Sequence, residues 1–110
     1  MSRARPPLPY PIEQALSRLG SNTALARKRR RLRQADVAAR TGLTVATVAR
    51  IERGHPGTSM SAYLAALWVL GLEREFADLA SPDRDEEGKT LEASRQPRRV
   101  GSTRALDDDF

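Results

Sequence analysis

The stretch that decides the fold is QADVAARTGLTVATVARIER, residues 34–53. Its apolar residues keep helical spacing on both sides of Gly42, so we predict two short helices joined at this glycine. The second helix should turn Val48 and Ile51, which are three residues apart, toward the interior. The inward set of the first helix is expected to be Ala35, Val37, Ala38 and Thr41.

Gly42 lies where the first helix must stop and the second must start at a steep angle. A left-handed backbone at such a corner suits glycine better than any side chain. Leu43 is then expected to pack inward, and Thr44 can cap the second helix through its hydroxyl. Two crossed helices with a glycine at the corner are typical of a helix-turn-helix, whose second helix enters the DNA major groove.

Length and composition limit the other classes of function. A chain of 110 residues is long enough for one small domain with an appendage. Without cysteine it has no disulfide framework, and one histidine, His55, argues against a metal centre. The acids near residue 85 lack the spacing of a calcium loop. We therefore expect no cofactor, no metal and no catalytic residues, so the protein should not be an enzyme.

The N-terminus carries no apolar segment of the kind found in secretory signals. No apolar run approaches the roughly 20 residues that cross a bilayer. These two features predict a cytoplasmic protein without membrane contact.

Charge is divided unevenly along the chain. Residues 1–70 hold 12 Lys and Arg against 3 Asp and Glu, a balance of +9. Residues 71–110 hold 7 against 11, a balance of −4. A basic first part favours a polyanionic partner, and the acidic remainder favours a different partner or a contact with the chain itself.

The chain is expected to be all-α, a compact bundle of about five short helices. Residues 1–11 contain four prolines and should form an extended arm. Residues 12–80 should form the helix-turn-helix domain, and residues 81–110 an acidic extension that is partly helical and then extended or disordered. Gly20 either kinks the first helix or ends it, since an interior glycine costs only about 1 kcal/mol.

Residues 26–33 place six cations in eight positions, beside the expected helix-turn-helix. Phosphates of the DNA backbone are the natural partners of such a cluster. The predicted backbone contacts are Arg27, Arg30, Arg33, Gln34, Arg40 and Arg53.

The outward surface of the second helix should lie near the base edges. Arg50 is its one side chain able to form two hydrogen bonds to guanine, which is worth about 1–3 kcal/mol against a wrong base. The alanines and Val45 offer only methyl groups, which suit thymine. The predicted base contacts are Thr44, Val45, Ala46, Thr47, Ala49 and Arg50. Readout by one copy would be thin, which favours a homodimer on a palindromic operator.

Glu52 is an acid on a helix that should face DNA. Since a carboxylate would repel the phosphates, we expect it to point inward or sideways. An arginine of the first long helix, such as Arg27, is its expected partner.

Residues 60–79 are unusually apolar for so small a unit. Trp68, Phe76 and Leu79 are therefore candidates for a dimer interface, with completion of the core as the alternative role of Trp68.

Residues 25–54, LARKRRRLRQADVAARTGLTVATVARIERG, resemble the phage-repressor (Xre/Cro-type) helix-turn-helix family. The matching features include Arg27, Gln34, the Val37–Ala38 pair, Gly42–Leu43 and Ile51–Glu52. The resemblance covers about residues 19–72 and implies double-stranded DNA binding. It departs from the family pattern at Arg33, where a capping Ser or Thr is usual.

A narrower resemblance extends into the tail, from Leu67 through Pro97–Val100, and is similar to HipB-type antitoxins. It implies a repressor that binds and neutralises a HipA-type kinase toxin and regulates its own operon. The toxin contact would be the acidic end with its aromatic residue, Asp107, Asp108, Asp109 and Phe110. The alternatives are a stand-alone Xre-type transcriptional regulator without a toxin and a non-specific basic nucleic-acid binder.

Overall fold

The computed structural model describes residues 7–95. By its internal contacts the chain divides into two units, and the boundary follows Ala77. All secondary structure in the described residues is helical, in agreement with the predicted all-α class. The first unit contains five α-helices, the number expected for the helix-turn-helix domain.

Helix α1 (Tyr10–Arg29) is continuous through Gly20, so the alternative in which the helix ends at this glycine is wrong. It begins two residues before residue 12, where the helical domain was predicted to start. Pro11 is tolerated because it lies in the first turn, where its missing N–H has no partner to lose. The helix ends in a pair of backbone bonds, from Arg31 N–H to Lys28 O and from Leu32 N–H to Arg27 O, with Arg31 in a left-handed conformation (φ 55°).

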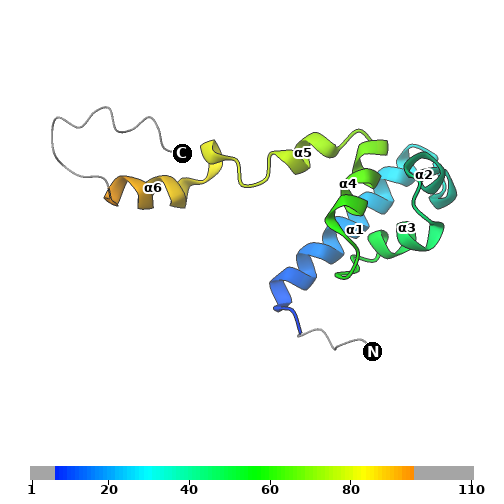
Figure 1. The fold of residues 1–110 in the computed structure, drawn as a ribbon, viewed down its shortest axis with the longest axis horizontal. Helices are drawn as coiled ribbons and strands as arrows, with labels where there is room; N and C mark the ends of the chain where they lie inside the picture. Colours follow the sequence, from blue (N-terminus) through cyan, green and yellow to red (C-terminus); the bar gives the residue numbers. More distant parts are fainter. Residues whose placement is uncertain (1–6, 96–110) are drawn as a thin grey trace. The chain divides into compact units, whose positions relative to one another are not determined.

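Helices α2 (Gln34–Thr41) and α3 (Val45–Glu52) pack against each other, and α3 also packs on α1. Figure 1 shows this pair beside the second half of α1. Helix α4 (Met60–Val69) starts at Ser59, which accepts a hydrogen bond from Ala62 N–H, and is followed by Gly71 (φ 77°). The core shared by these helices is formed by Val37, Ala38, Val48, Ile51, Ala62, Tyr63 and Ala66.

Ala35 was expected to face this core, and that prediction was wrong because Ala35 is exposed. Helix α5 (Glu73–Ala77) ends three residues before residue 80, the predicted end of the domain. Leu79 therefore lies beyond the helix, with an exposed fraction of 67%.

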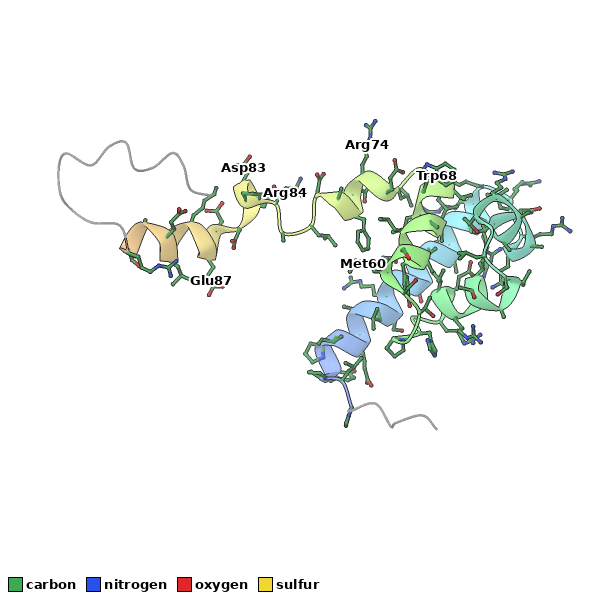
Figure 2. All side chains as sticks on the ribbon, viewed as in Figure 1. Met60, Trp68, Arg74, Asp83, Arg84 and Glu87 are labelled. Atoms are coloured by element: carbon green, nitrogen blue, oxygen red, sulfur yellow. The ribbon has the colours of Figure 1, made fainter. Side chains whose placement is uncertain are left out.

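The second unit contains a 3-10 turn, Pro82–Arg84, followed by α6 (Glu86–Arg95). Asp85 caps α6, because its carboxylate accepts a hydrogen bond from Gly88 N–H at 3.0 Å. Neither element buries a residue, and Figure 2 shows Asp83, Arg84 and Glu87 projecting outward from them. The predicted toxin contacts at residues 107–110 lie outside the described residues.

Within residues 7–95, no helix is both long and apolar enough to cross a membrane. The same range contains no group of three or more His, Cys, Asp or Glu side chains that could hold a metal ion.

Candidate nucleic-acid interface

The turn between α2 and α3 has the geometry predicted for Gly42. Its φ is 80°, and its N–H donates to Ala38 O at 2.9 Å. Thr41 also stabilises the corner, because its hydroxyl donates to Val37 O and accepts from Leu43 N–H. A Cβ on Gly42 would meet no atom within 4 Å, so the glycine is required by the backbone conformation and not by close packing.

Thr44 caps α3 as predicted. Its Oγ1 accepts a hydrogen bond from Thr47 N–H at 3.1 Å and lies 3.0 Å from Thr47 Oγ1. The two hydroxyls are thus bonded to each other. Together they fix the first turn of the helix that would approach DNA.

Helix α2 begins without the usual hydroxyl cap, because Arg33 occupies that position. Asp36 substitutes for it in part: its Oδ2 accepts a hydrogen bond from Arg33 N–H at 2.7 Å. The side chains of Arg33 and Asp36 also form an ion pair, and hydrogen bonds from Arg33 lower the pKa of Asp36. The Arg33 side chain stays exposed on the surface.

Two glycines allow α1 and the end of α3 to cross in direct backbone contact. A Cβ on Gly20 would lie 2.6 Å from the carbonyl oxygens of Ile51 and Glu52. A Cβ on Gly54 would lie 2.5 Å from Leu16 O, and Gly54 also has a left-handed φ of 71°. Gly20 is therefore a packing residue in a helix that does not end there.

The pair of Arg27 and Glu52 holds α3 against α1. Arg27 Nε and Nη2 donate to the two Glu52 oxygens at 2.6 and 2.9 Å, and Arg27 Nη1 donates to Leu32 O at 2.8 Å. Gln34 Nε2 adds a bond to Glu52 Oε1 at 2.9 Å. The expected partnership of Glu52 with Arg27 is thus confirmed.

These contacts also set the protonation of Glu52. Burial acts to raise the pKa of its carboxyl, but the hydrogen bonds from Arg27 and Gln34 and the nearby positive charge outweigh burial. The pKa of Glu52 therefore lies below its usual range, and the group is ionised at neutral pH.

Arg27 does not fit the predicted set of DNA backbone contacts. It is 9% exposed, and its guanidinium is bonded to Glu52 and Leu32, so little of its surface is left for a phosphate. Gln34 is half-buried, and its amide is engaged by Glu52. The other members of that set are on the surface: Arg30, Arg33, Arg40 and Arg53.

The charge balance around α2 and α3 leaves a surplus of cations. Asp36 and Glu52 are the acids of residues 20–60, and each is paired with an arginine. Among the described residues, no ion pair within 4.0 Å engages the following exposed cations: Lys28, Arg29, Arg30, Arg31, Arg40, Arg50 and Arg53. This part of the surface is suited to a polyanion.

The residues predicted to reach bases lie on α3 and its cap, and none of them is among the buried residues of the helix, Val48 and Ile51. Thr44, Val45, Ala46 and Arg50 are exposed, whereas Thr47 and Ala49 are half-buried. Their contacts with DNA stay predictions, but the structure brings all six to one short helix and its cap.

Helix α4 presents a second, apolar surface. Met60 and Trp68, labelled at its two ends in Figure 2, are 68% and 60% exposed. Completion of the core by Trp68 is thereby excluded. Trp68 and the half-buried Phe76 belong to an apolar groove between α4 and α5, whose other apolar members are Leu64, Ala65 and Ala77.

Residues 18–79, more than half of the chain, match the model of the helix-turn-helix domain family. The chain belongs to the helix-turn-helix domain family. The matched range contains α2, the Gly42 turn and α3, and it makes DNA binding the expected activity of the first unit. No curated protein and no solved structure matches the chain.

Two features of this interface escaped sequence reasoning. The contact between Gly20 and Gly54 joins residues 34 positions apart, and the one available signal was the placement of glycines in otherwise helical segments. The capping role of Asp36 was also missed, although an acid three residues into a helix is a known sign of a reciprocal cap.

Proposed function

We propose that this protein is a transcriptional repressor that binds a specific double-stranded DNA operator as a homodimer. The observation that carries this proposal is the division of α3 into two faces. Its inner face is fixed by the core and by the Arg27–Glu52 pair, while Val45, Ala46 and Arg50 stay exposed on its outer face. The protein acts through binding and carries out no reaction.

The electrostatics of the first unit support the same proposal. The acids nearest α3 are neutralised within the protein, so the exposed arginines present an excess of positive charge around the recognition helix. In this arrangement Arg40 and Arg53 bind phosphates and set the register, and Arg50 reads a guanine.

Dimer formation is the part of the proposal that concerns α4 and α5. The exposed Trp68 and the groove beside it are the apolar surface that a second copy would cover. Leu79 is a further candidate for the dimer interface, because its side chain is exposed. Two copies would read two half-sites about 34–36 Å apart.

The finer proposal is that this repressor is the antitoxin of a HipBA-like operon and neutralises a HipA-type kinase toxin. Its support is the sequence resemblance of the tail, together with an acidic unit that follows the basic one. The alternative is a stand-alone Xre-type regulator, and it is favoured if the neighbouring reading frame encodes no kinase-like protein.

Binding to DNA selected from a random duplex library tests the main proposal. The Arg50→Ala protein should bind the selected duplex about 5–150-fold more weakly and bind random DNA nearly as well as before. The matched control is Arg53→Ala, which should weaken both and lower the salt slope of binding by about 0.9. Equal losses on both duplexes for Arg50→Ala would place Arg50 at a phosphate, and absence of an enriched sequence would contradict the proposal.

The dimer is tested by light scattering with two variants of exposed α4 residues. Trp68→Ser should shift the protein toward the monomer, whereas Met60→Ser, which changes a residue outside the groove, should not.

A toxin partner is tested by co-purification of the neighbouring gene product with the full chain and with a chain lacking residues 96–110. Unchanged capture by the shortened chain would remove residues 107–110 from the contact.

A further inference from the structure

The polar side chains around the outward surface of α3 are largely engaged within the protein. Thr44 and Thr47 bond to each other at 3.0 Å, and Thr44 also accepts from Thr47 N–H. Gln34 donates its amide to Glu52 at 2.9 Å. Each of these three side chains therefore uses part of its hydrogen-bonding capacity to hold α3 in place.

Beside these polar groups, the outward surface offers the guanidinium of Arg50 and a set of methyl groups. Val45 is 46% exposed, Ala46 is exposed, and Ala49 is half-buried. Val45 and Ala49 are four residues apart, as are Ala46 and Arg50, so they form two neighbouring rows on the helix. Side chains in such rows have Cβ atoms about 5–6 Å apart, which is one to two steps along a DNA strand at about 3.4 Å per step.

Methyl groups recognise one feature of the major groove, the C5-methyl group of thymine. They neither donate nor accept hydrogen bonds, so they do not sense the group at position 4 of the pyrimidine. Thymine carries an oxygen there and 5-methylcytosine carries an amino group, but both present the same C5-methyl group. A surface of this composition distinguishes methylated from unmethylated pyrimidines.

We propose that Val45, Ala46 and Ala49 read a pyrimidine C5-methyl group next to the guanine bound by Arg50, and accept thymine and 5-methylcytosine alike. Methylation of cytosine in a matching site then strengthens binding of this protein. The inference rests on the proposed function, because it describes what the same helix face reads.

The test uses the full chain and the duplex selected from the random library, resynthesised in four forms. At one thymine of the half-site the pair is A·T, A·U, G·C or G·5-methylcytosine. Loss of one contacted methyl group should weaken binding about fourfold in the uracil form. The cytosine form should be weakened as well, and the 5-methylcytosine form should recover most of that loss.

Three single variants, Val45→Ser, Ala46→Ser and Ala49→Ser, locate the reading groups. All three keep a small side chain on α3, and thermal unfolding followed by circular dichroism checks that each folds. At least one should bind the thymine and uracil forms equally. Arg50→Ala is the matched control, and it should weaken both forms by the same factor.

Equal binding of the thymine and uracil forms at every thymine of the half-site would overturn the inference and leave sequence-specific binding standing. A thymine preference that survives in all three serine variants would also overturn it, because the preference would then come from DNA shape. Enrichment of no sequence from the library would contradict the proposed function and the inference with it.

Discussion

Residues 7–77 and residues 78–95 are both helical, but they differ in what their helices bury. The first unit contains all nine of the buried hydrophobic residues of the described chain, among them Ile51 and Val48, whereas α6 and the turn before it bury none. In α6 the observed stabilising contact is a local cap, since Asp85 bonds to Gly88 N–H. Burial against neighbouring helices is what gives the first unit a defined interior and α3 a defined orientation.

The ion pairs show the same contrast. Arg27 and Glu52 have side chains about one tenth exposed, at 10% and 8%. Lys89 and Glu86 in α6 are 49% and 80% exposed. Water screens the second pair and hardly reaches the first, so the two pairs should differ in their contributions to stability.

The largest expected effect is therefore at Glu52. Glu52→Ala leaves Arg27 buried without its partner and should lower the free energy of unfolding by about 3–5 kcal/mol. Glu86→Ala in α6 is the matched change at an exposed pair and should cost at most about 0.5 kcal/mol. Urea unfolding followed by circular dichroism measures both. Similar small losses would mean that the buried pair does not hold α3.

The pH dependence of stability follows from the same residue. The pKa of Glu52 is lower in the folded protein than in the unfolded chain, where it is about 4.3. Its contribution is thus fully present above pH ~4.3 and is lost as the pH falls through the folded pKa. Melting temperatures from pH 6 downward should show a steeper acid-side loss for the natural protein than for Glu52→Gln. Parallel curves would contradict this assignment.

Two glycines with left-handed backbones separate conformational strain from close packing. Gly71→Ala meets no atom within 4 Å, so it should cost only roughly 1–2 kcal/mol for its φ of 77°. Gly54→Ala has the same penalty plus the clash with α1, which should add about 1–3 kcal/mol. The difference between the two losses in free energy of unfolding measures the cost of an added methyl group where α1 and the end of α3 are in close contact. Equal losses would show that the helices relax around the new methyl group.

Turns and caps in this fold were predicted more accurately from the sequence than contacts between distant residues. Gly42 and Thr44 were predicted correctly because a turn or a cap depends on a few adjacent residues. Gly20 and Arg27 were harder, since their roles depend on residues 34 and 25 positions away. One Arg27 prediction, the pair with Glu52, was right. The other, contact with phosphate, stays a prediction that burial of Arg27 disfavours, and this burial could not be read from a run of cations.

Removal of residues 78–110 is expected to have the smallest effect. Because the part of this segment that the structure describes buries no residue, its deletion should change the stability of the first unit by no more than about 0.5 kcal/mol. Thermal unfolding and DNA binding of the shortened chain, compared with the full chain, check this. A loss as large as that of Gly54→Ala would show that the second unit supports the first.

The central claim is that α3 enters the major groove with Arg50 at a guanine, and chemical interference on the selected duplex tests it most directly. Methylation of guanine N7 marks the major groove, and methylation of adenine N3 marks the minor groove. We expect N7-methylguanine at one position in each half-site to prevent binding of the natural protein. Binding of the Arg50→Ala protein should be the same with and without this methyl group. Interference from N3-methyladenine alone, or from neither base, would contradict the placement of α3 in the major groove.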